Sequence, residues 1–271
     1  SQIIYQAILP YYVNRVDSDV WFESFTPPTS CAFLPLVTAK KVVGLVHFLS
    51  GEEMLRKYKM PFFLIERLGL KFYKNFITVS SVWKNKIKQV NPKAKISVIP
   101  NGFDNSLTSQ NKKTGKYIFF IGRIDVEQKG LDILLRVYSL IRNKINYDLV
   151  IAGTGVKNET KKLNDLIKRY NLNDRVKLIG RIEGKEKISA YRNALFVVLP
   201  SRFETFSLSA LETMGLGLPL VIFNIPGTSW IPTKCCIKVD PFDENKLADC
   251  ILALAKNSKL REELGRKAFQ Y

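Results

Sequence analysis

The second half of the chain alternates regularly between short apolar runs and amphipathic stretches. The apolar runs predict strands at 117–122, 147–152, 176–180, 195–200 and 219–223, and the stretches between them predict helices at 130–143, 160–170, 185–193 and 206–216. Successive strand–helix units of this kind pair in a mostly parallel sheet, because their crossover connections are right-handed. The alternation therefore predicts a doubly wound α/β lobe, followed by two further helices at 244–256 and 259–269.

The first half of the chain has a less regular pattern. Its apolar runs predict strands at 20–25, 42–49, 76–80 and 96–100, with one long helix at 52–75 between the second and the third. Pro100-Asn101-Gly102 ends this pattern, and the polar residues 104–116 that follow are typical of a linker. We therefore predict two α/β domains, one at 1–108 and one at 109–271.

Composition limits the class of protein and the kind of partner. The apolar runs fall far short of the ~20 residues that a transmembrane helix needs. Four cysteines without a CxxC pair, and the lack of a secretory signal, favour a reducing, cytoplasmic compartment. The formal net charge of +18 suits an anionic partner such as a nucleotide, an anionic lipid surface or a nucleic acid. The alternative is that surface lysines only keep the protein soluble.

Two glutamates, Glu204 and Glu212, lie eight positions apart just after the apolar run 195–200. A helix that begins near Phe206 places Glu204 in the strand-to-helix loop and Glu212 on the second helical turn. Both carboxylates then lie at the carboxyl edge of the sheet, where doubly wound folds bind ligands. The alternative is that both are ordinary surface charges, as most glutamates are.

Basic side chains follow the first strand of the same lobe. Gly122 and Arg123 end the run 117–122, and Lys129 comes directly before Gly130 at the start of the next predicted helix. A diphosphate needs positive charge and free amide donors, and these residues together with a helix N-terminus supply both.

Two further segments fit a ligand of this kind. The amides of Phe206, Ser207 and Leu208 are expected to begin the helix after Glu204, where they offer donors to a second phosphate edge or a sugar oxygen. Gly153-Thr-Gly155 ends another strand with a tight turn, which alone is weak evidence.

In their order and spacing, these motifs resemble the retaining glycosyltransferases of family 4. The resemblance covers nearly the whole chain from about Asp19 onward and rests on short motifs in both halves. These are Gly122-Arg123 with Lys129-Gly130, Gly153-Thr-Gly155, Val176–Gly180, the E-x7-E pair Glu204 and Glu212, and 214–219, together with 43–47, Thr78-Val-Ser80 and 99–104 in the first half.

The resemblance implies the GT-B fold, in which two Rossmann-like doubly wound lobes face a cleft. The family's first strand would precede Ser1 and its terminal helix would follow Tyr271, so we expect an incomplete N-terminal lobe and a chain truncated at both ends. The resemblance also implies that Arg123 and Lys129 bind the donor diphosphate. Gly122 and the amides of 206–208 would complete that donor site.

The resemblance also implies roles for the acidic residues and for a histidine. Glu204 would contact the donor sugar, Glu212 would bind the ribose hydroxyls, and the loop that contains Arg181 would face the nucleobase. His47, the only histidine, matches the family's active-site histidine, whereas residue type alone favours a structural role. Ser207 departs from the family pattern, which commonly has glycine at that position.

The implied activity is a hexosyltransferase, which transfers a hexose from a UDP- or GDP-sugar to a glycan or lipid-linked acceptor with retention at the anomeric carbon. No cofactor is predicted. No metal is predicted either, because the D-x-D motif Asp17-Ser-Asp19 precedes a strand and is typical of a turn. The basic and apolar stretch 54–74 leaves open two interpretations, contact with an anionic membrane at its inner face or packing on the first lobe.

Two other classes of function are alternatives. The first is another GT-B enzyme, such as a nucleotide-sugar epimerase, which would need additional acids and histidines. The second is a basic nucleic-acid-binding or nucleotide-sensing module, although the resemblance leads us to expect no nucleic-acid partner.

Overall fold

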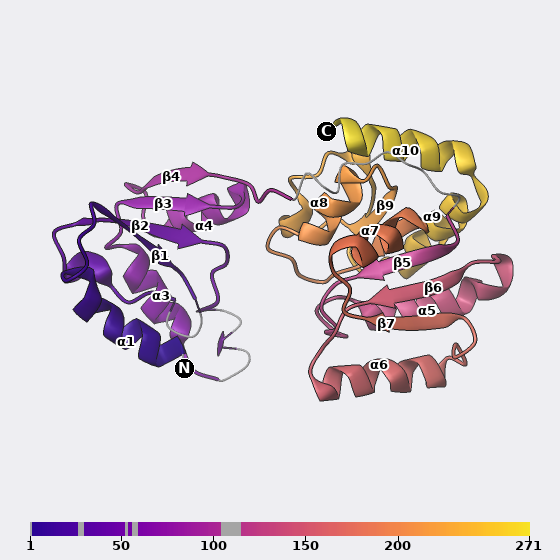
Figure 1. Cartoon of the computed structure of the whole chain (residues 1–271), viewed down its shortest axis with the longest axis horizontal. Coiled ribbons are helices and arrows are strands. Elements are labelled where there is room, and N and C mark those ends of the chain that lie inside the picture. The colour runs from indigo at the N-terminus through magenta and orange to yellow at the C-terminus, as the bar shows by residue number, and fades with distance from the viewer. Residues whose placement is uncertain (1, 27–29, 52–53, 56–58, 104–114) are drawn as a thin grey trace. The chain divides into compact units, whose positions relative to one another are not determined.

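The computed structural model describes residues 2–26, 30–51, 54–55, 59–103 and 115–271. The chain divides into two compact units, Ser1–Asn101 and Gly102–Tyr271, whose elements are labelled in Figure 1. The predicted linker at 104–116 lies almost wholly outside the described residues.

The N-terminal unit contains a parallel sheet with the strand order β1-β2-β3-β4. Its strands are β1 (Val20–Ser24), β2 (Lys41–Val46), β3 (Asn75–Thr78) and β4 (Lys95–Val98), and its α-helices are α1 (Gln2–Val13), α3 (Phe62–Leu70) and α4 (Ser81–Val90). The rings of Phe25, Tyr73 and Phe76 contact one another in its core, with centroids 5.2 to 5.9 Å apart. The Asp17-Ser-Asp19 motif lies in the turn between α1 and β1.

The long helix predicted at 52–75 is wrong in extent. Residues 52–53 and 56–58 lie outside the description, and α3 runs only from Phe62 to Leu70, with Pro61 at its N-cap. Proline has no amide hydrogen and clashes with a preceding helical turn, so it can begin a helix but interrupts one that passes through it. Asn75, the predicted last helical residue, already belongs to β3.

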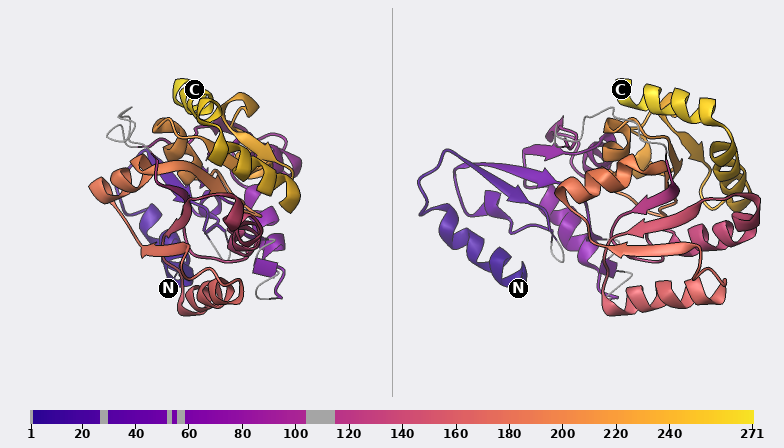
Figure 2. Two further views of the ribbon diagram at one scale, coloured as in Figure 1. Left: turned by 90° about the vertical axis from the view of Figure 1, so that its right-hand side faces the viewer. Right: turned by 45° about the vertical axis from the view of Figure 1, so that its right-hand side comes forward.

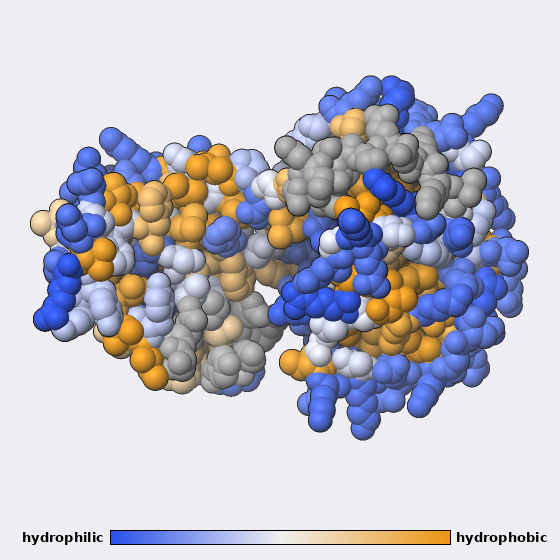
Figure 3. Space-filling model, viewed as in Figure 1, coloured by the Kyte–Doolittle hydropathy of each residue, from blue (hydrophilic) through white to orange (hydrophobic). Residues whose placement is uncertain are grey.

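Apolar side chains are exposed on two helices of the N-terminal unit. On α1 they include Ile4, Ile8 and Tyr11, and on α3 they include Leu64 and Leu68. In the view of Figure 3, patches of hydrophobic residues are visible on the surface of the N-terminal unit. None of the helices in the described part of the chain combines the length and the apolarity that are needed to cross a membrane.

The C-terminal unit contains a six-stranded, all-parallel sheet with the order β10-β9-β8-β5-β6-β7. Its strands are β5 (Tyr117–Ile121), β6 (Asp148–Ala152), β7 (Val176–Gly180), β8 (Ala194–Leu199), β9 (Leu220–Phe223) and β10 (Ile237–Val239). The chain proceeds from β5 outward to β7 and then returns to β8 on the other side of β5. This is the strand order of a doubly wound Rossmann fold, so the predicted fold of this lobe is confirmed.

Helices cover both faces of this sheet, since β8 and β9 are buried at every position. The helices are α5 (Leu131–Ile141), α6 (Lys157–Arg169), α7 (Gly184–Arg192), α8 (Leu208–Gly215), α9 (Glu244–Lys256) and α10 (Ser258–Gln270). Helix α5 packs against α6 and α9, and α10 packs against α8 and α9. Figures 1 and 2 show α10 and α6 at opposite ends of the unit.

Candidate functional site

The sheet of the C-terminal unit has a switch point between β5 and β8, where the chain order reverses. These two strands are neighbours, with Phe119 opposite Val197 in the ladder. Ligands of doubly wound folds bind beyond the carboxyl ends of the strands at this point. The loop after β5 carries Arg123 and Lys129, and the loop after β8 carries Glu204.

These two loops are joined by close backbone and side-chain contacts. Gly130 has a left-handed φ of 65°, and a Cβ there would lie 2.0 Å from the carbonyl oxygen of Pro200. The amide of Arg202 donates to the Gln128 carbonyl at 2.9 Å, and its guanidinium donates to both carboxylate oxygens of Asp132 at 2.7 Å. The hydrogen bonds to Asp132 raise the pKa of Arg202. The residues that flank Lys129 and the residues just before Glu204 are therefore fixed relative to each other.

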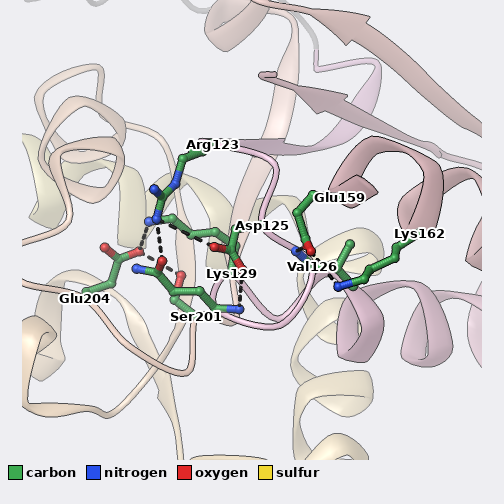
Figure 4. Close-up of polar contacts among 9 residues, drawn as sticks. Arg123, Asp125, Val126, Lys129, Glu159, Lys162, Ser201 and Glu204 are labelled. Atoms are coloured by element: carbon green, nitrogen blue, oxygen red, sulfur yellow. Dashed lines mark hydrogen bonds and ion pairs between the residues drawn. The ribbon is translucent and has the colours of Figure 1, made fainter. Parts of the chain in front are cut away.

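Lys129 and Glu204 form an ion pair between the two loops (Figure 4). Lys129 Nζ lies 2.8 Å from Glu204 Oε1, and the Ser201 hydroxyl donates to the same oxygen at 2.7 Å. Their side chains are only 17% and 11% exposed. Within the described residues, Glu204 Oε2 accepts no hydrogen bond, and an ammonium group has three N–H donors. The pair therefore keeps both an acceptor and cationic donors for a ligand.

Arg123, in the loop after β5, is more exposed than Lys129 and Glu204. Its guanidinium donates to the Gln128 side chain and lies 3.7 Å from Asp125 Oδ2, while its side chain remains 64% exposed (Figure 4). The loop itself is tied back to α6, because Glu159 accepts the Val126 amide at 2.8 Å. An exposed pair such as Arg123–Asp125 contributes little energy, so this guanidinium is free to turn toward an anion.

Glu212 lies on the second turn of α8, where α7 supplies its partners. Lys187 Nζ lies 2.6 Å from Oε1, and the Tyr191 hydroxyl donates to Oε2 at 2.9 Å. Tyr191 is wholly buried, and its ring contacts that of Phe119 edge-on with centroids 5.4 Å apart. Burial raises the pKa of Tyr191 well above its usual value, so the phenol stays protonated and remains a donor.

The start of α8 differs from the prediction that Phe206, Ser207 and Leu208 all begin this helix. The helix begins at Leu208, and Ser207 is its N-cap with φ 60° and ψ 77°. This left-handed conformation is incompatible with a right-handed helix. Phe206 is buried in a stacked pair with Trp230, with centroids 4.6 Å apart, and its carbonyl accepts the Trp230 indole N–H at 2.5 Å. Of the three predicted amides, only that of Leu208 belongs to the helix.

Two further predicted site residues are Arg181, in the C-terminal unit, and His47, in the N-terminal unit. Arg181 pairs with Glu183 at the surface, and its described contacts include neither Glu204 nor Glu212. His47 is exposed after the end of β2, in the N-terminal unit. The roles of Arg181 and His47 stay predictions.

The glycines at the ends of β5 and β6 serve backbone packing. Gly122 donates its amide to the Ala152 carbonyl at 3.1 Å. A Cβ on Gly153 would lie 1.8 Å from the Gly122 carbonyl oxygen, and one on Gly155 would lie 2.2 Å from that of Ile124. These close approaches account for both glycines without a ligand.

Several residues that support the site could not be predicted from the sequence. Ser201, Arg202, Lys187, Tyr191 and Trp230 all contact a candidate site residue or fix its loop, yet none belongs to a recognised motif. The only available signal was the position of Ser201, three residues before Glu204. The other contacts join segments that lie far apart in the sequence.

A family model described as glycosyl transferases group 1 matches residues 103–271, which is more than half of the chain. The chain belongs to the group 1 glycosyltransferases. Among curated relatives of this glycosyltransferase chain, the O-antigen biosynthesis glycosyltransferase WclY of Escherichia coli is 30% identical over 176 residues, covering 61% of this chain and 48% of WclY. The chain thus spans about half the length of the curated relatives it matches.

Solved structures show the fold of the whole glycosyltransferase chain. A sucrose-phosphate synthase from Thermosynechococcus elongatus superposes with a TM-score of 0.81 at 20% identity, covering 98% of this chain and 71% of that one. Anabaena HepE, crystallised with UDP-glucose, gives a TM-score of 0.78 at 17% identity and covers 98% and 76%. The expected GT-B type, with a parallel α/β sheet in each unit, is confirmed.

Proposed function

We propose that this chain is part of a retaining glycosyltransferase that transfers a hexose from a UDP- or GDP-sugar to a glycan or lipid-linked acceptor. The observation that carries the proposal is the pairing of Lys129 with Glu204, across the two loops of the switch point. An anion-binding cation and a hydroxyl-binding carboxylate thus lie in contact where doubly wound folds bind nucleotides. HepE, which shares the fold, was crystallised with UDP-glucose.

The basic residues would act on the leaving diphosphate. Negative charge grows on the diphosphate as the bond to the anomeric carbon breaks, and fixed positive charge offsets it most effectively in a water-poor site. Lys129 donates one N–H to Glu204, and its ammonium group has other N–H donors for a phosphate oxygen. Arg123 is exposed enough to join it.

The acidic residues would bind hydroxyl groups. Glu204 Oε2, which accepts no hydrogen bond among the described residues, is available to a hydroxyl of the donor sugar. Glu212 would bind the ribose hydroxyls through Oε1, beside Lys187. In this assignment neither carboxylate has to transfer a proton.

Calorimetric titration of the 271-residue chain with UDP-glucose and GDP-mannose tests donor binding. A hydrogen bond to a charged group contributes about 1.5–3 kcal/mol, so Glu212→Ala should weaken the preferred nucleotide sugar about tenfold or more. Glu263→Ala is the matched control, because Glu263 also pairs with a lysine, Lys267, but on the exposed surface of α10. If no nucleotide sugar binds, and RNA binds in a salt-dependent manner instead, the proposal is wrong.

The stereochemical part of the proposal has its own test. In the absence of acceptor, slow hydrolysis of an α-linked donor should first release the α-anomer of the hexose, as observed by proton NMR before mutarotation. First release of the β-anomer would indicate inversion and contradict this part alone.

The lipid-linked alternative for the acceptor is supported by the exposed side chains of α3. Leu64 and Leu68 are exposed on this helix, whose last turn contains Arg67. Such a combination of apolar and basic residues favours an anionic membrane surface. We expect the chain to float with phosphatidylglycerol vesicles and not with phosphatidylcholine vesicles. Failure to float with either would favour a water-soluble glycan acceptor.

A further inference from the structure

Tyr191 and Glu212 form a contact that the proposed roles of the site do not include. Tyr191 lies on α7, 21 positions before Glu212, and its hydroxyl donates to Oε2 at 2.9 Å. The other oxygen, Oε1, faces the ammonium of Lys187 at 2.6 Å. Each carboxylate oxygen of Glu212 therefore has its own partner, one buried and one partly exposed.

The two partners differ in how firmly they are held. Tyr191 is wholly buried and its ring contacts Phe119 of β5, so its hydroxyl has a fixed position. The Lys187 side chain is 26% exposed and ends in a flexible ammonium. Tyr191 is thus the partner that can define the orientation of the carboxylate, whereas Lys187 can move when a ligand arrives.

We propose that Tyr191 is a positioning residue for nucleotide recognition, which turns Glu212 so that Oε1 faces the ribose of the donor. The inference rests on the proposed function, in which Glu212 binds the ribose hydroxyls. A glutamate on a helix surface has several rotamers of similar energy, and recognition of a diol needs one of them. The Tyr191 hydroxyl selects that rotamer before the nucleotide binds.

A purely structural role for Tyr191 makes a different prediction. The loss of its hydroxyl would then lower stability but would leave the preference for ribose unchanged. The relevant readout is the ratio of the affinities for a nucleoside diphosphate and its 2′,3′-dideoxy analogue, because only the sugar hydroxyls differ between these two ligands.

The experiment measures this ratio by calorimetry with UDP and 2′,3′-dideoxy-UDP, or with the guanine pair if GDP binds better. Wild type should prefer the ribose form about tenfold or more. Tyr191→Phe should reduce that preference several-fold, and should cause no further change when Glu212→Ala is already present. Tyr138→Phe is the matched control, since it removes another buried hydroxyl of this unit, which donates to the Tyr147 carbonyl at 2.8 Å.

The outcomes separate the inference from the proposed function. An unchanged ratio in Tyr191→Phe, with Glu212→Ala still reducing it, overturns the inference alone. A wild-type chain that binds no nucleoside diphosphate overturns both.

If Tyr191→Phe fails to fold, 4-aminophenylalanine at position 191 replaces the O–H donor by an N–H donor. Loss of the ribose preference in that folded variant would overturn the inference, because a donor of the same reach is still present.

Discussion

Glu204 and Glu212 have similar hydrogen-bond partners, but they lie on different kinds of backbone structure. Each carboxylate contacts one lysine and one hydroxyl group, Lys129 and Ser201 in the first case and Lys187 and Tyr191 in the second. Glu204, however, lies in a loop, whereas Glu212 is placed by the regular geometry of α8. A residue in a loop depends on long-range contacts for its position, so changes in its surroundings should affect Glu204 more than Glu212.

The loop of Glu204 is in fact anchored from three directions. Arg202 binds it to Asp132 at the start of α5. Trp230 stacks on Phe206, and a Cβ on Gly227 would lie 1.9 Å from the Glu204 carbonyl oxygen. These contacts are expected to position the acid for the sugar, and their loss should spare nucleotide binding.

The largest expected difference between the two acids comes from direct substitution. Glu204→Gln should lower turnover about 100-fold, because it removes the charge nearest the proposed sugar site while nucleotide affinity stays nearly constant. Glu212→Gln should mainly weaken nucleotide binding. Donor hydrolysis and calorimetric titration of UDP or GDP measure the two effects. If both variants lose turnover and affinity in the same proportion, the division of roles is wrong.

The next largest effect on turnover should come from the close backbone contact between Gly227 and Glu204. Gly227→Ala forces the Glu204 backbone to move, because a Cβ would lie 1.9 Å from its carbonyl oxygen. Overpacking of this kind costs about 1–3 kcal/mol, and we expect turnover to fall about tenfold with nucleotide affinity retained. Gly102→Ala is the control, since a Cβ there meets nothing within 4 Å. Equal unfolding midpoints for the two variants would show that the loop adapts freely.

The fold of the C-terminal unit was predictable because parallel strands buried on both faces appear as continuous apolar runs. Helix α4 was not predicted, since it buries only Trp83 and Ile87 and its sequence is otherwise mostly polar. Within the site, Arg123, Lys129 and the two glutamates could be named because short motifs follow directly after strands.

The supporting contacts of the site were not predictable for a physical reason. Tyr191 has the sequence context of any core aromatic residue on an amphipathic helix, and only the fold brings its hydroxyl to Glu212. Arg202 and Asp132 are 70 positions apart. The left-handed conformation of Ser207 was not predicted, because serine is common at ordinary helix starts, although the glycine that the resembled family commonly has at this position is compatible with it.

A smaller effect is expected from the ion pair that holds the Glu204 loop. Arg202→Lys removes the two parallel hydrogen bonds to Asp132, both 2.7 Å long, and lysine cannot replace this geometry. The pair is partly exposed, so we expect a loss of only about 1 kcal/mol in urea unfolding, with a few-fold loss of turnover. Arg136→Lys is the control, because Arg136 binds Glu244 in the same two-pronged manner on the surface. A loss of turnover in Arg136→Lys as well would show that the effect is not specific to the loop.

The smallest expected effect lies at Ser207, where the loop of Glu204 meets the helix of Glu212. Ser207 holds a left-handed φ of 60°, which costs serine about 1–2 kcal/mol and glycine almost nothing. Glycine loses more chain entropy on folding, so the net gain from Ser207→Gly should be about 0.5 kcal/mol. Ser209→Gly, within the first turn of α8, should instead destabilise by about 0.5 kcal/mol. Thermal unfolding compares the pair, and destabilisation by both substitutions would mean that the junction adopts a right-handed conformation in solution.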